Sequence, residues 1–324
     1  MINKKKKHAE ITTTQIVLLI VLIASFVIIV YFLVRLNPGR ETESQICHTS
    51  VVTRSSNFLT KQIVKTPINC KTDYICLSKD GSCEKMTSPE IKKVKTKEEV
   101  YEALADEAVD CWWKFGEGKL DYVGTDLQYD INGPKPKLYC SICSQVAFDD
   151  SLYSMFVTDL GIPDLPASDY PSLISKQDFY NYLANTNVPG KEITYLDYFL
   201  GLTNSELISD ALESNNYVFG YIDVKKQHLI MMGEFSVIGT LDKILNGFVA
   251  GVFGAVTLPL LIVGNPLPIQ ILVAQISPFG QGEGYLLGTV MQGESEHFYL
   301  SPSIIEANSE DYEKLKCEDV TTLA

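Results

Sequence analysis

The feature that most constrains this chain is an unbroken apolar run from Ile16 to Val34, IVLLIVLIASFVIIVYFLV. In an α-helix these residues would rise by about 28 Å, close to the hydrocarbon thickness of a bilayer. The run therefore predicts a transmembrane helix over residues 16–36 that contacts the lipid bilayer through Ile16–Val34. Lys4, Lys5, Lys6 and Lys7 precede it. Because positive charge resists translocation, we expect residues 1–15 to be a cytoplasmic basic tail and the rest to be exported.

Two other interpretations of the run remain open. A cleaved signal peptide is less favoured, because the run is longer than a typical signal core and the following LNPGRETES lacks a small-x-small cleavage site. The residues before the run, from His8 to Ile11, resemble the processing site of archaeal type IV pilin-like precursors. Cleavage between Ala9 and Glu10 would then free a helix that packs into a filament. Thr12–Gln15, however, delay the apolar stretch relative to many such pilins.

All eight cysteines follow the apolar run: Cys47, Cys70, Cys76, Cys83, Cys111, Cys140, Cys143 and Cys317. In an exported domain, an even number of cysteines predicts a framework of disulfides. Four bridges can be drawn in 105 ways, so the sequence leaves the connectivity open. We expect one pair, Cys76 with Cys83, because these residues flank the Asp80-Gly81 turn.

The charge of the chain excludes one class of partner. The chain carries a net charge of −13 in all. Since residues 1–40 hold six Lys or Arg and only Glu10, the part expected to be exported has 21 basic and 39 acidic residues, a net −18. Such an acidic domain repels nucleic acid and anionic lipid headgroups, so we expect no nucleic-acid binding.

The pattern beyond the run predicts an α+β fold, with an N-terminal transmembrane helix followed by a disulfide-stabilised extracytoplasmic domain of short helices and antiparallel strands. Residues 37–46 are polar and resemble a linker. Residues 47–150 form a Cys-rich helical and hairpin part, and residues 151–324 an α+β part.

The clearest helix is predicted over residues 96–115, where Thr96 and Glu99 fit a capping box and Gly116 follows the end. Its expected buried stripe is Val100, Leu104, Ala108, Cys111 and Phe115. Trp112 and Trp113 are expected to be core anchors. Shorter helices are expected over residues 175–184, capped by Ser175, and 204–214.

Three hairpins are predicted from alternating apolar residues around turn signals: residues 72–86, residues 217–235 around Lys225-Lys226, and residues 284–303 around Gly293. Between the last two lies a Gly-rich apolar segment, residues 238–276, which is uncharged from Phe248 to Val263. A buried hairpin is the first interpretation of this segment. A loop dipping into a membrane or partner and a second membrane span remain as alternatives.

Cys140-Ser141-Ile142-Cys143 is the one motif with a chemical interpretation. A C-x-x-C after a strand and at the start of a helix can form a labile, catalytic disulfide. No βαβ pattern surrounds it, so structural disulfides are favoured over redox activity. Zinc bound by Cys70, Cys76, Cys140 and Cys143 is a third alternative. The sequence contains no G-x-S-x-G, Walker A or H-E-x-x-H motif, and predicts no cofactor, no metal and no other catalytic residue.

DCWWKFGEGK at Asp110–Lys119 and YCSICSQVAFDD at Tyr139–Asp150 resemble a group of uncharacterised archaeal membrane-anchored proteins with a cysteine-bearing exported domain. The resemblance covers the apolar run and about half of the exported part, and excludes the segment from Gly247. It implies a basic start, one hydrophobic helix and an exported domain, but no known activity.

These observations predict a single-pass cell-membrane protein with a cytoplasmic N-terminus and an extracytoplasmic C-terminal domain. We expect that domain to bind or scaffold a protein partner, or to self-associate. The alternatives are a pilin-like filament subunit and an extracytoplasmic thiol–disulfide oxidoreductase that uses Cys140 and Cys143.

Overall fold

The structure, a computed structural model, describes residues 13–35, 39–56, 67–123, 137–156, 172–201, 220–236, 254–257, 270–274, 285–292, 298–315 and 317–319. The contacts divide the chain into two compact units, Met1–Glu43 and Ser44–Ala324. The second unit spans both of the parts expected over residues 47–150 and 151–324.

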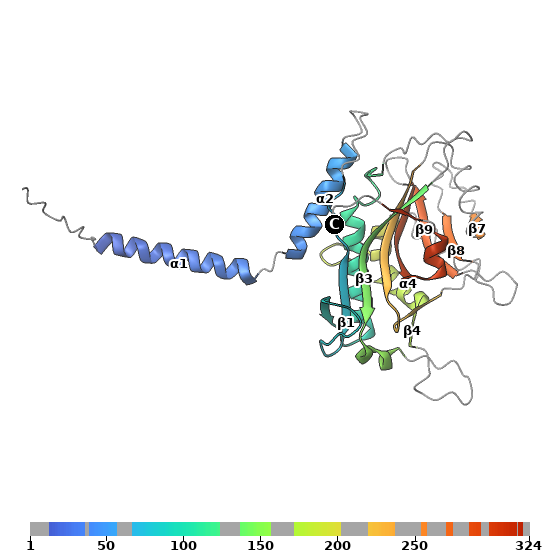
Figure 1. Cartoon of the computed structure of the whole chain (residues 1–324), viewed down its shortest axis with the longest axis horizontal. Coiled ribbons are helices and arrows are strands. Elements are labelled where there is room, and N and C mark those ends of the chain that lie inside the picture. Colours follow the sequence, from blue (N-terminus) through green and yellow to red (C-terminus); the bar gives the residue numbers. More distant parts are fainter. Residues whose placement is uncertain are drawn as a thin grey trace, which may run out of the picture. The chain divides into compact units, whose positions relative to one another are not determined.

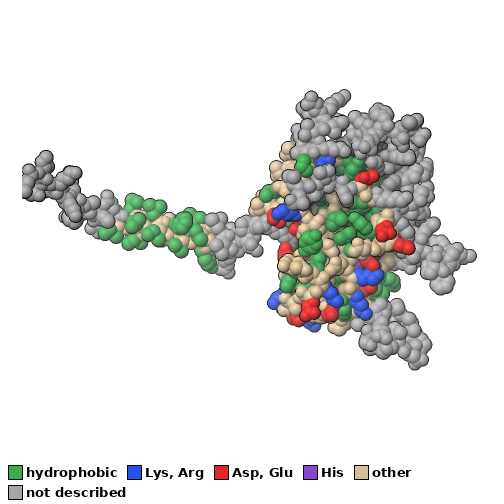
Figure 2. Space-filling model, viewed as in Figure 1, with side chains coloured by type: hydrophobic (Ala, Val, Ile, Leu, Met, Phe, Trp, Pro, Cys, Tyr) green, Lys and Arg blue, Asp and Glu red, His purple; other side chains and the backbone are tan. Residues whose placement is uncertain are grey.

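The first unit contains α1 (Thr13–Arg35) and the first turn of α2 (Gly39–Ser56). Every side chain from Ile16 to Tyr31 is exposed, and Figure 2 shows the hydrophobic surface that these side chains give to α1. Within α1, side chains are described for Thr14 and for Ile16 to Tyr31. Among the residues that the structure describes, no helix is found that is long and apolar enough to cross a membrane.

The second unit is built on a mixed sheet in which nine described strands pair (Figure 1). The strands are β1 (Asp73–Ser78), β2 (Glu90–Lys93), β3 (Lys137–Phe148), β6 (His228–Ser236), β7 (Gly254–Thr257), β8 (Gln270–Ala274), β9 (Tyr285–Gln292), β10 (Phe298–Glu306) and β11 (Glu318–Asp319). Their order is β2-β1-β3-β6-β10-β9-β8-β7, and β11 also pairs with β3.

The α+β class is confirmed, but the expectation of antiparallel strands alone is wrong. β1 pairs in parallel with both β2 and β3, and β11 pairs in parallel with β3. The hairpin expected over residues 72–86 is also wrong, because β1 has no antiparallel partner among the described strands. Cys83 is bonded to Cys76 in the middle of β1, so the chain turns back beside the strand. It then enters β2 opposite Ile75 and runs in the same direction as β1.

Helix α3 (Lys97–Lys114) packs on one face of the sheet and confirms the clearest sequence prediction. The Thr96 side chain accepts a hydrogen bond from the Glu99 N–H, and Gly116 follows the helix with φ +84°. The Glu99 carboxylate accepts from the backbone N–H of Lys95, one residue before the position that a capping box uses. All five residues of the expected stripe are buried: Val100, Leu104, Ala108, Cys111 and Phe115.

The remaining described elements are short. Between β3 and β6 lie a 3-10 helix (Asp150–Met155), β4 (Leu173–Ser175), α4 (Lys176–Asn185), α5 (Tyr195–Leu200) and β5 (Tyr221–Asp223). After β10 comes α9 (Glu310–Lys314). α4 and α5 contact each other and α3. The helix expected over residues 175–184 is confirmed, with the Ser175 side chain accepting from the Asp178 N–H.

The central strands are buried on both faces. The core beneath the helices includes Val146, Ile230, Met232 and Tyr299. Residues that alternate with them along β3, β6 and β10 are also buried: Leu138, Met231, Phe235, Leu300 and Ile305. Since successive side chains of a strand point to opposite faces, these residues fill a second apolar layer on the other side of the sheet.

The hairpin expected around Gly293 is confirmed, because β9 pairs antiparallel with β10. The hairpin expected over residues 217–235 is wrong: β5 pairs with β4 in a separate two-stranded sheet, while β6 lies between β3 and β10. β3 and β10, which are both longer than β5, pair with the two edges of β6, so no edge is left for β5.

Four expected features differ from the structure or lie wholly or largely outside the described residues. From Gly39 onward, the expected linker belongs to α2. Within the apolar segment 238–276, the described pieces are β7 and β8, which pair antiparallel. The rest of that segment, the helix expected over residues 204–214, and the possible cleavage site at Ala9 and Glu10 lie outside the described residues.

Candidate functional site

The C-x-x-C motif lies inside β3 and does not form a disulfide of its own. Cys143 is bonded to Cys111 of α3, and Cys140 is bonded to Cys317 near β11. The two Cα–Cα distances are both 5.4 Å. A redox C-x-x-C needs its two sulfurs to bond to each other at the start of a helix. The redox interpretation of Cys140 and Cys143 is therefore contradicted by their position in an extended strand and by their partners.

The remaining cysteines form two more bridges, Cys76–Cys83, as predicted, and Cys47–Cys70. All eight cysteines are thus paired, which confirms the structural disulfide framework. The thiolates that zinc would need at Cys70, Cys76, Cys140 and Cys143 are consumed by these bonds. Among the described residues, no cluster of His, Cys, Asp and Glu has a geometry that could hold a metal ion.

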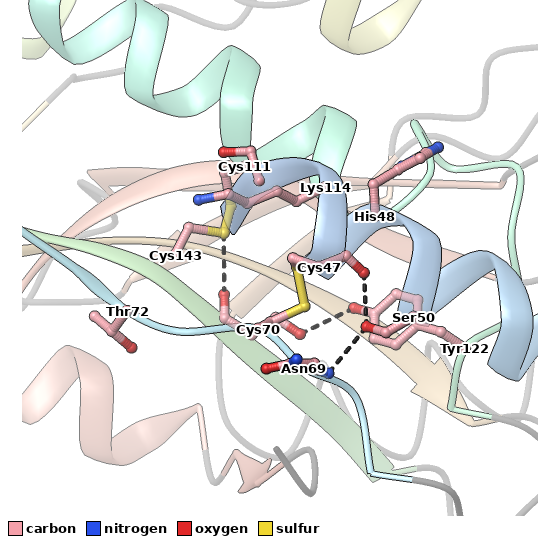
Figure 3. Close-up of a disulfide and its surroundings, with 12 residues drawn as sticks. Cys47, His48, Ser50, Asn69, Cys70, Thr72, Cys111, Lys114, Tyr122 and Cys143 are labelled. Atoms are coloured by element: carbon pink, nitrogen blue, oxygen red, sulfur yellow. Dashed lines mark hydrogen bonds between the residues drawn. A yellow bond between two sulfur atoms is a disulfide. The ribbon is translucent and has the colours of Figure 1, made fainter. Parts of the chain in front are cut away.

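The Cys47–Cys70 bridge belongs to a dock that holds α2, which is part of the second unit from Ser44 onward, against the rest of that unit (Figure 3). The buried side chains of Ser44, Cys47 and Val51 lie along one side of α2. The Ser50 hydroxyl accepts a hydrogen bond of 2.9 Å from the backbone N–H of Asn69. One turn of α2 is therefore joined to the segment before β1 both by a covalent bond and by a hydrogen bond.

The same helix also contacts α3. The Ser44 hydroxyl donates to a carboxylate oxygen of Asp110 over 3.0 Å. The His48 ring stacks on Trp113 with centroids 4.3 Å apart, and its Nδ1 lies 2.8 Å from the Trp113 carbonyl oxygen. Trp113 is half-buried and contacts α2 through this stack with His48. Trp112 is buried in the core, as expected, and its ring meets Tyr299 edge-on. We name this set of contacts, from Ser44 to Arg54, the α2 dock.

Beneath the dock lies a buried ammonium group. Lys114 Nζ is 2.8 Å from a carboxylate oxygen of Asp73 and 2.7 Å from one of Asp110. Burial lowers the pKa of Lys114, but Asp110 and Asp73 act in the opposite direction and outweigh it, so its pKa lies above the usual value. Since Asp110 also accepts from Ser44, the dock is connected through Asp110 to this ion cluster.

Among the described residues, the most deeply buried carboxyl is that of Glu234, near the end of β6. One of its oxygens accepts hydrogen bonds from the backbone N–H groups of Tyr122 and Val123, at 3.2 and 3.1 Å. Burial, followed by the nearby Asp121 carboxylate, raises the pKa of Glu234 well above its usual value. Arg54 of α2 interacts electrostatically with Glu234, although burial lowers the pKa of the guanidinium.

A second buried carboxyl connects α3 to the sheet. Glu107 is 2.6 Å from Lys92 Nζ and accepts a hydrogen bond of 2.7 Å from the Ser144 hydroxyl. Both carboxylate oxygens are therefore engaged, as burial of a charge requires.

Neither the α2 dock nor the role of Glu234 is predicted by the sequence patterns. The one sequence signal for Glu234 was a charged residue on the core-facing register of an otherwise apolar strand. For the dock, no local signal was available, because the partners of Ser44 and Ser50 lie 66 and 19 positions away in the chain.

Comparison of the chain with protein-family models, with curated proteins and with solved structures finds no match in any of the three.

Proposed function

We propose that the chain is a single-pass cell-membrane protein whose extracytoplasmic domain binds or scaffolds a protein partner. The observation that carries the proposal is the α2 dock. Only three residues separate α1 from α2, and α2 is joined to the rest of its domain by a disulfide, by hydrogen bonds of Ser44 and Ser50, and by a ring stack. A helix that links an anchor to a folded domain needs attachments that survive outside the cell, and disulfides suit an oxidising compartment.

The anchoring step rests on the sequence of α1 and the exposure of its side chains. A large exposed apolar surface is unfavourable in water and marks contact with lipid or protein. In the sequence the apolar run continues to Val34, and basic residues precede it. These features support a cytoplasmic N-terminus and an exported domain, as in the membrane-anchored archaeal proteins that the two motifs resemble.

Membrane anchoring is tested by fractionating cells that produce the full chain and washing their membranes at alkaline pH. We expect the protein to stay with the membranes, and Ile23→Arg to release a large fraction of it, because a charge at the centre of a span costs about 3 kcal/mol on insertion. Ile23→Leu is the matched control and should behave as the wild type. Release of the wild type by the wash would refute the anchor.

Topology is tested separately with intact cells and a membrane-impermeant maleimide, after mild reduction. Labelling of the domain cysteines from outside is expected. Labelling only after lysis would place the domain in the cytoplasm and overturn the proposal.

A pilin-like filament subunit is the second candidate, favoured by the exposed apolar surface of α1. Mass spectrometry of the mature N-terminus separates the two proposals. A protein that begins at Met1 supports the uncleaved anchor, whereas one that begins at Glu10 supports the filament subunit.

A further inference from the structure

The C-terminal arm, which we define as Ser309–Leu315 and Cys317–Asp319, is attached to the sheet in an unusual way. It contains α9, which contacts β10, and β11, which is only two residues long. β11 pairs with β3 through Glu318 opposite Tyr139 and Asp319 opposite Cys140. A ladder of two residues provides little stability by itself. The Cys140–Cys317 disulfide therefore has a large share in holding this strand in place.

Beneath the arm lies a stretch of the edge of β3 that no other described strand covers. β1 covers the same edge of β3 only from Ser144 to Phe148. Around Tyr139 and Cys140, β11 takes that place. If β11 leaves, the backbone groups that β3 directs toward it around Tyr139 and Cys140 lose their partners, whereas those directed toward β6 keep theirs. An unpaired strand edge is a template for a strand from another chain.

The arm joins the sheet at a tight turn. The Ala307 N–H donates to the carbonyl oxygen of Gln227, the residue that precedes β6, just before the arm begins. Asn308 follows with φ +59°, in the left-handed region that non-glycine residues adopt uncommonly. Rotation at this one residue would swing the arm away while β10 keeps its pairing with β6 and β9.

We propose that the C-terminal arm exchanges between copies of this chain, so that β11 of one copy pairs with β3 of a second copy and Cys317 of the first is bonded to Cys140 of the second. The occupant is a second copy because the edge at Tyr139 already accepts this strand and this cysteine, and an exchanged arm repeats every contact of the closed one. Domain swapping of identical elements is a low-cost route to oligomers for this reason.

The chemistry of the exchange is balanced without any net oxidation. A small thiolate attacks the Cys317 sulfur, which forms a mixed disulfide and releases Cys140 as a thiolate. The Cys140 thiolate of a second, similarly opened copy then attacks the Cys317 sulfur of the first. This step forms the intermolecular bond and regenerates the small thiol. The number of disulfides is unchanged, so the thiol acts as a catalyst.

The experiment uses full-length protein in detergent, prepared in unlabelled and uniformly ¹⁵N-labelled forms and mixed in equal amounts. Glutathione is raised until alkylation shows that a fraction of Cys140 has been opened, and the mixture is then quenched with acid and alkylated. Mass spectrometry of the digest looks for a ¹⁴N peptide containing Cys140 linked to a ¹⁵N peptide containing Cys317.

We expect mixed-isotope links, with a several-fold rise between dilute and concentrated protein because exchange between copies is bimolecular. Cys317→Ser should abolish them. Cys76→Ser combined with Cys83→Ser is the matched control, because it removes another disulfide and leaves the arm intact; mixed links should persist in it. If Cys140 is opened and only links within one isotope re-form at every concentration, the proposal is overturned.

Discussion

The four disulfides differ greatly in the length of chain that they close, and this difference predicts different contributions to stability. Cys140–Cys317 spans 177 residues and Cys76–Cys83 spans 7. If a disulfide stabilises by restricting the unfolded chain, these lengths correspond to about 5 and about 2 kcal/mol. Replacing both cysteines of the long bridge with alanine should therefore cost about 3 kcal/mol more than the same change in the short one.

The two pairs are matched controls for each other. Each consists of one buried cysteine and one half-buried cysteine, so the loss of packed sulfur is similar. The assay is denaturant unfolding of the full chain in detergent, followed by tryptophan fluorescence, for the wild type and both double variants. Equal losses in the two variants, or a larger loss for the Cys76 and Cys83 variant, would refute the chain-entropy argument.

Three further predictions concern the buried ionisable groups. Burial raises the pKa of Glu234 above 4.5 in the folded protein, so the folded state holds this proton more tightly than the unfolded state and loses stability as pH rises. Glu234→Gln does not titrate, so its stability relative to the wild type should increase between pH 4.5 and pH 8. The same difference in unfolding midpoint between variant and wild type at both pH values would contradict this. Burial lowers the pKa of His228 below 6.5, so the wild type should lose stability as pH falls below 6.5. His228→Gln should lose less stability between pH 7 and pH 5, as measured by thermal unfolding at these two pH values. Lys114→Met leaves Asp73 and Asp110 without their shared cation and should lower the free energy of unfolding by about 3–5 kcal/mol. Adding Asp73→Asn and Asp110→Asn should restore part of that stability. A triple variant no more stable than Lys114→Met would argue against the ion cluster.

Local signals in the sequence were enough for several elements. Thr96 and Gly116 mark the ends of α3, and the spacing from Val100 to Phe115 identifies its buried face. The caps and the 3.6-residue period act within a few residues, so no distant contact is needed to interpret them. The Cys76–Cys83 bridge was predictable for the same reason, because its two residues flank one turn.

Strand pairing did not follow from such signals. The two strands expected to form a hairpin at Lys225 both exist, but β5 pairs with β4 and β6 with β3 and β10. Alternation of apolar residues tells which face of a strand is buried, and says nothing about which other strand lies beside it. The C-x-x-C motif was misleading for a related reason. Its redox chemistry requires that the motif begin a helix, whereas Cys140 and Cys143 lie within strand β3.

The sequence by itself determined that this chain has a long apolar helix, a set of eight cysteines suited to oxidising conditions and an acidic α+β domain, because composition and short-range periodicity carry that information. Only the tertiary structure decided how the other six cysteines pair, that α2 docks through Cys47, and that the arm at Cys317 closes the edge of β3. These contacts join residues far apart in the chain, and their formation depends on how the whole sheet and α3 bring those residues together.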